Sequence, residues 1–276
     1  MKIVRDVAAV RAAVAGSGRV GLVPTMGAFH EGHLSLIRAA RAACDVVVVW
    51  LFVNPTQFNE KSDLAGYPRD EERDAALAAE CGADILFAPS VAAVYPAGFA
   101  TTVTVAGVAD VLEGALRPGH FAGVATVVAK MLNMVGPEVA FFGAKDAQQV
   151  AVVRRMVADL DIGTRIEVLP IVREADGLAM SSRNVRLDPD ERRRATALHR
   201  GLTSARAAVT GEERDAAVLA RLVQDELADA GIAVEYVAVI DPDSFEPVET
   251  IAGPTLIALA ARVGATRLID NIEVAP

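Results

Sequence analysis

The 276-residue sequence lacks the features that define several large classes of protein. Its two cysteines, Cys44 and Cys81, are too few for a disulfide framework or a thiolate metal site, and their apolar neighbours predict buried free thiols. The longest apolar run, at 46–53, has the length of a strand and cannot span a bilayer. The first residues lack the apolar region of a signal peptide. We therefore expect a cytoplasmic protein with no membrane partner.

Basic residues are in the minority. The net charge at pH 7 is −9, and the sequence contains only the lysines Lys2, Lys61, Lys130 and Lys145. Nucleic acids bind to broad basic surfaces, so this composition argues against a nucleic-acid partner but leaves room for a small anionic ligand. Hydrophobic residues make up 53% of the sequence, which excludes a disordered chain and is enough for one large core or two smaller ones.

Apolar runs alternate with amphipathic segments through the first half. We predict strands at 20–23, 45–53, 84–88, 139–142 and 165–172. We predict helices at 32–43, 70–81, 121–135 and 148–160. An alternating segment at 101–105 is predicted to be an edge or accessory strand. Strands separated by helices indicate a parallel sheet that is covered on both faces.

The pattern changes after about Val172. Helices are predicted at 188–209 and 212–230, and strands at 234–240, 255–261 and 267–269. This order is typical of an α+β domain. The predicted fold class is therefore α/β, with a Rossmann-like parallel-sheet domain of residues 1–171 and a smaller α+β C-terminal domain of residues 172–276.

A turn at Met26–His33 connects the first predicted strand of this sheet to a helix. Ligands bind at the carboxyl ends of parallel strands, and a helix N-terminus attracts anions. Gly27 and Gly32 allow close approach to the backbone. His30 and His33 share one face of the first helical turn, where both can donate hydrogen bonds to phosphoryl oxygens. The turn predicts phosphate binding; chance spacing or half of a metal site is the alternative, although the zinc-protease spacing is absent.

Three other segments carry polar residues at similar places. Asn54 and Gln57 follow the second strand and suit a substrate hydroxyl or carboxylate, unless this is an ordinary strand exit. Lys145 lies in a glycine turn between a strand and a helix, where it is either a point charge for phosphate or a solvated surface lysine. Two serines and an arginine at 181–183 form an anion clamp or only a capped loop between domains.

Together the four segments resemble the pantoate–β-alanine ligase (pantothenate synthetase) family, from Val23 to Asn271. Its further motifs are Tyr67-Pro68-Arg69, Arg117-Pro118-Gly119-His120-Phe121, Arg173-Glu174-Ala175-Asp176-Gly177 and Arg267-Leu268-Ile269-Asp270-Asn271. The resemblance implies that ATP activates pantoate as pantoyl adenylate, which then reacts with β-alanine to give pantothenate, with release of pyrophosphate and AMP, in coenzyme A biosynthesis. It also implies Mg²⁺ on the β- and γ-phosphates and a homodimer.

The resemblance also implies roles for the two domains and for individual residues. Residues 1–171 would bind ATP and pantoate, and residues 172–276 would act as a lid. The expected catalytic residues are His33, which matches the family's assigned proton donor, His30 and Lys145. The expected ATP-binding residues are Met26, Gly27, His30, Gly32, His33, Gly143, Ala144, Lys145, Asp146, Val172, Met180, Ser181, Ser182 and Arg183. The expected pantoate and β-alanine ligands are Gln57, Gln149 and Asn54. The acidic metal position matches Asp74, with Glu72 nearby.

The chain departs from the family's usual residues at Phe29, Thr56, Ala144 and Ala147, where leucine, methionine, glutamate and an aromatic residue are usual. None of these positions is assigned to charge stabilisation, so we expect an active enzyme. Three alternatives are a nucleotidyltransferase that keeps the nucleotide on its product, an aminoacyl-tRNA-synthetase-like protein and a non-catalytic nucleotide-binding module. The neutral glutamines favour a hydroxy acid over a phosphorylated acceptor, and the net charge of −9 argues against tRNA.

Overall fold

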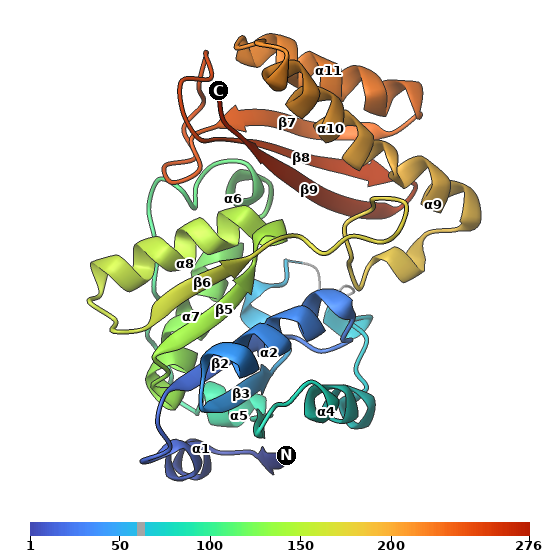
Figure 1. The fold of residues 1–276 in the computed structure, drawn as a ribbon. Coiled ribbons are helices and arrows are strands. Elements are labelled where there is room, and N and C mark those ends of the chain that lie inside the picture. The colour runs from blue at the N-terminus through green and yellow to red at the C-terminus, as the bar shows by residue number, and fades with distance from the viewer. Residues whose placement is uncertain (60–63) are drawn as a thin grey trace. The chain divides into compact units, whose positions relative to one another are not determined.

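The computed structural model describes residues 1–59 and 64–276, which form two compact units (Figure 1). The first unit consists of residues 1–144 and 152–170, and the second of residues 145–151 and 171–276. The sequence places a domain border between residues 171 and 172, and the chain passes between the units one residue earlier. The short segment 145–151 groups with the second unit, which the sequence does not indicate.

A six-stranded parallel sheet forms the centre of the first unit, in the order β1-β4-β3-β2-β5-β6. The strands are β1 (Lys2–Val4), β2 (Val20–Thr25), β3 (Val46–Leu51), β4 (Ile85–Phe87), β5 (Val139–Gly143) and β6 (Arg165–Leu169). From β2 the chain continues to β3 on one side, and from β5 to β6 on the other. The strand order therefore reverses between β2 and β5, and this is where such sheets bind ligands.

Helices cover the sheet and fix its core. They are α1 (Val7–Val14), α2 (Glu31–Ala43), α4 (Glu71–Glu80), α5 (Val91–Val94), α6 (Glu113–Leu116), α7 (His120–Val135) and α8 (Ala147–Asp159), whose first residues belong to the second unit. Ile37 of α2 packs into one core with Val47 and Val49 of β3. Because side chains alternate along a strand, the buried Val48 faces the opposite side of the sheet. Helix α7 is buried on nearly all sides, as its apolar sequence requires.

The second unit contains an antiparallel three-stranded sheet in the order β7-β8-β9. The strands are β7 (Ala233–Ile240), β8 (Thr255–Val263) and β9 (Thr266–Val274), and the helices are α9 (Pro189–Ala195), α10 (Ala197–Thr210) and α11 (Ala216–Asp229). Helices α10 and α11 lie against each other and against the sheet (Figure 1), and Leu202, Val223 and Leu259 meet in their common core. The two units confirm the predicted fold class.

Three predicted segments differ from the structure. The segment 101–105 pairs with no described strand; the Val103 N–H instead donates to the Thr126 hydroxyl of α7, at 2.9 Å. The predicted helix 188–209 is two helices, α9 and α10, which meet at Thr196. The strand predicted at 267–269 is the much longer β9, because it pairs with β8 along its whole length.

Charges of both signs are mixed on the surface, and the apolar segments are used inside the two units. Among the described residues, no helix is both long enough and apolar enough to cross a bilayer. Cys44 is buried and Cys81 is partly exposed, both as free thiols, so the prediction of burial is confirmed for Cys44 alone.

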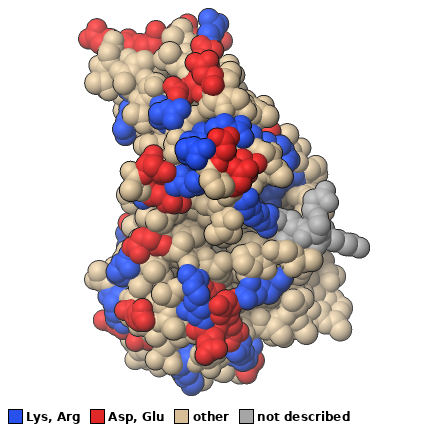
Figure 2. Space-filling view, turned by 90° about the vertical axis from the view of Figure 1, so that its right-hand side faces the viewer, with Lys and Arg blue, Asp and Glu red and all other residues tan. Residues whose placement is uncertain are grey.

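Figure 2 shows basic and acidic side chains next to each other over one face of the molecule. Arg192 illustrates this mixing, with Glu174 and Asp176 each 2.7 Å away.

The contact between α7 and the 3-10 helix η1 (Pro55–Gln57) depends on Gly123. A Cβ atom at Gly123 would lie 2.6 Å from the Thr56 carbonyl oxygen. Alanine normally stabilises a helix interior relative to glycine. We predict the opposite sign here: Gly123→Ala should lower the free energy of unfolding by about 1–3 kcal/mol through overpacking, seen as a lower Tm.

The matched control is Gly163→Ala, since a Cβ atom there meets nothing within 4 Å. This change should alter the free energy of unfolding by less than about 0.5 kcal/mol. Equal melting temperatures for the two variants would contradict the close packing of α7 on η1.

Candidate functional site

The turn from β2 to α2 ends in a capping box built from two histidines. His30 is the N-cap of α2, and its Nδ1 accepts the Gly32 N–H at 3.2 Å. The Nδ1 of His33 accepts the His30 N–H at 3.4 Å. The two rings lie 4.1 Å apart between centroids. Both predicted phosphate ligands therefore sit together at the positive end of α2.

These hydrogen bonds determine where each imidazole carries its proton. A backbone N–H can only donate, so Nδ1 of His30 and Nδ1 of His33 must both be acceptors. A neutral imidazole with an accepting Nδ1 carries its proton on Nε2. Each ring is thus a hydrogen-bond donor at Nε2 without needing to be charged, which is the property that binding of phosphoryl oxygens requires.

Asp74 holds the backbone of the same turn. Gly27 and Ala28 have φ values of 91° and 55°, in the left-handed region that favours glycine. The Asp74 carboxylate, 1% exposed, accepts the N–H groups of Ala28 and Phe29, each at 2.8 Å. Each Asp74 oxygen accepts one of these N–H groups, which gives the carboxylate a structural partner within the turn; its expected role as a metal ligand stays a prediction. The described residues also contain no cluster of three or more potential metal-binding side chains.

Asn54 is buried at the carboxyl end of β3 and uses all its polar atoms within the protein. Its Oδ1 accepts from Tyr95 Oη at 2.8 Å, from Thr56 Oγ1 at 3.0 Å and from Thr56 N at 3.4 Å. Its Nδ2 donates to Gln57 Oε1 at 2.9 Å and to the Gly123 carbonyl at 3.2 Å. The structure therefore shows Asn54 bound to neighbouring protein groups, and its expected contact with substrate stays a prediction.

Gln57 is oriented on a second side by residues that the sequence marks only as part of a motif. The Nδ1 of His120 lies 2.8 Å from the backbone carbonyl oxygen of Gln57. The guanidinium of Arg117 lies 3.1 Å from His120 Nε2, and since arginine can only donate, His120 carries its proton on Nδ1. The Gln57 Nε2 lies 3.3 Å from the sulfur of Met26, so its NH₂ group faces the turn at residues 26–33, called the histidine turn below.

The second predicted phosphate turn follows β5. Gly143 and Ala144 belong to the first unit and lie beside the switch point of the sheet. Lys145 and Asp146 belong to the second unit, with 3.9 Å between Nζ and the carboxylate. The Lys145 carbonyl accepts the side-chain N–H of Asn271 at 2.9 Å. The lysine side chain is 20% exposed, which makes a freely solvated surface lysine the poorer description.

A partly buried ion pair holds Arg173, near the start of the segment 172–183, within the second unit. Arg173 binds Asp270 of β9 through two parallel hydrogen bonds of 2.7 and 3.0 Å. Such bidentate pairs fix geometry as well as charge. The neighbouring Arg192 guanidinium lowers the pKa of the Asp176 carboxyl from its usual value through a hydrogen bond. The Asp176 carboxylate therefore stays charged, and the segment is anchored on both sides.

The remaining predicted ATP contacts, Val172 and Met180 to Arg183, lie on this anchored segment. The Val172 carbonyl accepts the Met180 N–H at 3.0 Å. The Ser181 hydroxyl accepts the Arg183 N–H at 3.2 Å, so this serine caps its own loop. Ser182, Met180 and Arg183 are partly exposed, as is the expected pantoate ligand Gln149 in α8. This hydrogen bond agrees with a capped loop at Ser181 and leaves its hydroxyl proton able to donate to a ligand, so the expected ATP contacts of the segment stay predictions.

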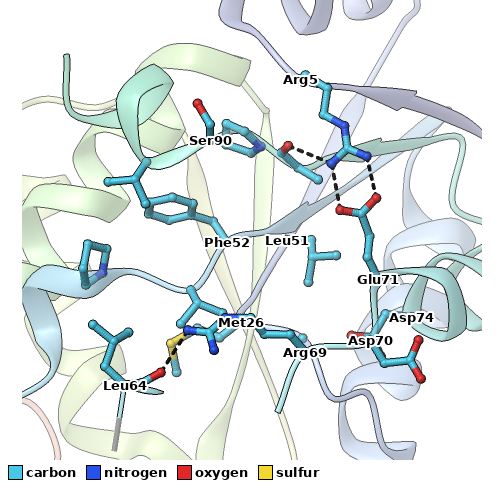
Figure 3. Close-up of a pocket in the computed structure, with 16 residues that line it drawn as sticks. Arg5, Met26, Leu51, Phe52, Leu64, Arg69, Asp70, Glu71, Asp74 and Ser90 are labelled. Atoms are coloured by element: carbon cyan, nitrogen blue, oxygen red, sulfur yellow. Dashed lines mark hydrogen bonds and ion pairs between the residues drawn. The ribbon is translucent and has the colours of Figure 1, made fainter. Parts of the chain in front are cut away.

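A pocket of about 540 Å³ opens beside the histidine turn within the first unit (Figure 3). Met26 and Gly27 line it, together with apolar side chains such as Leu51 and Phe52 from the end of β3. Arg69 contributes a cation whose guanidinium donates to the Leu64 and Tyr67 carbonyls. The Arg5–Glu71 ion pair closes one end. Apolar walls with a few fixed polar groups are typical of small-molecule sites.

Comparisons with known proteins identify the family. A family model described as pantoate-beta-alanine ligase matches residues 2–273. Pantothenate synthetase from Moorella thermoacetica is 53% identical over 277 aligned positions, covering 99% of this chain and 98% of its own. The chain belongs to the pantoate–β-alanine ligase family. It is therefore an enzyme that ligates pantoate and β-alanine at the expense of ATP.

Two solved structures of the family share the fold. Pantothenate synthetase from Thermus thermophilus is 46% identical, with a TM-score of 0.96 and full coverage of both chains. The pantoate–β-alanine ligase of Francisella tularensis, crystallised with β-γ ATP and β-alanine, is 34% identical with a TM-score of 0.83, covering 99% of this chain and 97% of its own. The β-γ ATP and β-alanine of the latter structure correspond to two of the three substrates that the resemblance implies.

Replacing Asp74 separates its positioning role from the expected metal role. Asp74→Asn puts an NH₂ group against a buried N–H, so we predict a loss of about 1–3 kcal/mol in the free energy of unfolding. The Mg²⁺ concentration for half-maximal activity should not change. Thermal unfolding and Mg²⁺ titrations of activity measure both quantities.

Glu72→Gln provides the same change of charge on an exposed neighbour in α4, and should cost less than about 1 kcal/mol. An unchanged Tm in Asp74→Asn, combined with a weaker response to Mg²⁺, would contradict this prediction and favour the expected metal role.

Proposed function

We propose that the ligation proceeds in two steps through a pantoyl adenylate. A carboxylate oxygen of pantoate attacks the α-phosphorus of ATP, and the bond to the pyrophosphate leaving group breaks. The neutral amine of β-alanine then attacks the acyl carbon, which expels AMP and releases one proton. The carboxylate is already ionised, so the first step depends on positioning and on stabilisation of phosphoryl charge rather than on a general base.

The observation that carries this proposal is the pair of Nε2 donors at the N-terminus of α2. His30 and His33 lie at the N-terminus of α2, in the turn that follows β2. Both accept a backbone N–H at Nδ1, so each is a neutral donor at Nε2. Donors that are fixed before reaction stabilise the charge that develops on the phosphates without a cost of reorganisation. In this proposal they act as donors to phosphate oxygens, and Lys145 adds a full positive charge.

The remaining expected contacts divide between the two units. Gln57 and Gln149 bind pantoate, and Gly143 to Asp146 contact the nucleoside. In the second unit, the Val172 backbone binds adenine and the segment from Met180 to Arg183 closes over the triphosphate as a lid. Anchoring of this segment by Arg173 and Asp270 supports a defined contact surface. These assignments come from the family resemblance and are proposals for this chain.

Mg²⁺ enters this proposal as part of the nucleotide substrate. Mg²⁺ in phosphoryl-transfer sites keeps several waters and binds chiefly to substrate phosphates. This agrees with the engagement of Asp74 by the turn, and we assign no protein ligand to the ion. A homodimer and a cytoplasmic location also remain predictions from the family resemblance and the sequence; the mass in solution by light scattering tests the first.

A pyrophosphate assay tests the two-step proposal. With ATP and pantoate alone, we expect at most one equivalent of pyrophosphate per enzyme, with the adenylate held in the site. Addition of β-alanine should start continuous turnover with equal amounts of AMP and pantothenate. Pantoate-independent pyrophosphate release, or formation of ADP instead of AMP, would contradict the mechanism.

Substitution of the proposed charge donors should affect the first step. We predict that His33→Ala and Lys145→Ala each lower pantoate-dependent turnover by at least about 100-fold, the effect of removing one preorganised donor. Lys2→Ala is the matched control, since Lys2 is exposed on β1 and should leave turnover near normal. Near-normal turnover in either site variant would remove that residue from the mechanism.

A further inference from the structure

The orientation of the Asn54 side chain is fixed by two backbone groups. The Thr56 N–H can only donate, so the atom of Asn54 that it faces must be the oxygen. The Gly123 carbonyl can only accept, so the atom that it faces must be the nitrogen. Amide oxygen and nitrogen are hard to distinguish by shape, and these two contacts remove the ambiguity.

The orientation of Asn54 determines that of Gln57. Asn54 Nδ2 donates, so the Gln57 atom 2.9 Å away must be Oε1. The NH₂ group of Gln57 must then point the other way, toward Met26 and the histidine turn. Gln57 thus offers hydrogen-bond donors to the site, which suit a carboxylate or another oxygen acceptor of the acid substrate.

Two hydroxyl groups complete this arrangement. Tyr95 Oη and Thr56 Oγ1 lie 2.8 and 3.0 Å from Asn54 Oδ1, and since the amide oxygen can only accept, each hydroxyl is the donor in its contact with this oxygen. The two hydroxyl oxygens lie 3.3 Å from each other, where either can be the donor. Phe52 and Phe99 pack against the Tyr95 ring and hold it in place. Burial raises the pKa of the Tyr95 phenol, so it keeps its proton well into the alkaline range.

We propose that Tyr95 and Thr56 are positioning residues for the acid substrate, which act together through Asn54 to hold the Gln57 amide with its NH₂ group toward the site. Neither hydroxyl needs to contact substrate. Each provides one donor to the same oxygen, so either one partly replaces the other. The inference rests on the proposed role of Gln57 as a pantoate ligand. It adds Thr56, where this chain departs from its family, to the residues that determine affinity for the acid.

The test compares KM for pantoate in four variants at saturating ATP. Tyr95→Phe and Thr56→Val should each raise KM by about 2- to 3-fold, since one strong donor to Asn54 remains. The double variant Tyr95→Phe/Thr56→Val should raise KM by about 30-fold, more than the product of the single effects, as expected for coupled residues. Tyr95→Phe/Thr56→Ser keeps the hydroxyl and should behave like Tyr95→Phe. KM for ATP should not change in any variant.

Substitution of Asn54 tests the same series of hydrogen bonds at the residue that links the two hydroxyls to Gln57. Asn54→Asp can accept from both hydroxyls but cannot donate to Gln57, so we expect KM for pantoate to rise by about 100-fold or more, as when a charged group faces a misaligned polar partner. Thermal unfolding of each variant provides the folding control. The doubly substituted enzyme and the Asn54→Asp enzyme give independent answers if one of them does not fold.

The outcomes separate this inference from the function on which it rests. Wild-type enzyme without pantoate-dependent pyrophosphate release would overturn both. An active wild type would overturn the positioning role alone if the double variant shows only the product of the single effects, if serine fails to rescue, or if KM for ATP rises equally. Near-normal KM for pantoate in Asn54→Asp would also overturn it.

Discussion

The site depends on the hydrogen bonds between one buried carboxylate and the backbone of one turn. The oxygens of Asp74 accept the N–H groups of Ala28 and Phe29, which would otherwise be buried without partners in a turn of unfavourable backbone conformation. This turn places His30 at the N-cap of α2. Capping uses Nδ1 of the imidazole, and so leaves the proton on Nε2. A carboxylate that touches no ligand in our account thereby sets the hydrogen-bonding properties of the proposed phosphate site.

Much of the fold could be predicted from the sequence because its parallel strands are short apolar runs bounded by turns. The predicted core strands are all present in the sheet. The prediction for 101–105 is wrong because alternation alone does not reveal whether a backbone finds a neighbouring strand or, as here, the hydroxyl of Thr126. The break at Thr196 gives no signal since every residue around it tolerates a helix. The first error arises where a tertiary contact overrides local preference.

Prediction of the site works where local sequence determines local structure. The strand–turn–helix pattern around His30 and His33 is of this kind. The positioning roles of Asn54 and Asp74 could not be predicted because a sequence shows that a polar residue is present, but not that its polar atoms are already satisfied by distant groups. The contact of Tyr95 with Asn54 bridges 41 positions, and no local pattern reports it. Preorganised sites depend on such supporting contacts as much as on the groups that meet substrate.

The central claim is that a pantoate oxygen bonds to the α-phosphorus of ATP before the amine reacts. The most direct measurement follows that oxygen, using pantoate labelled with oxygen-18 in its carboxylate, unlabelled ATP and β-alanine. The account predicts that mass spectrometry of the recovered AMP finds one labelled oxygen per molecule, transferred when the amine expels AMP from the acyl carbon. AMP without label, or label in inorganic phosphate, would contradict it.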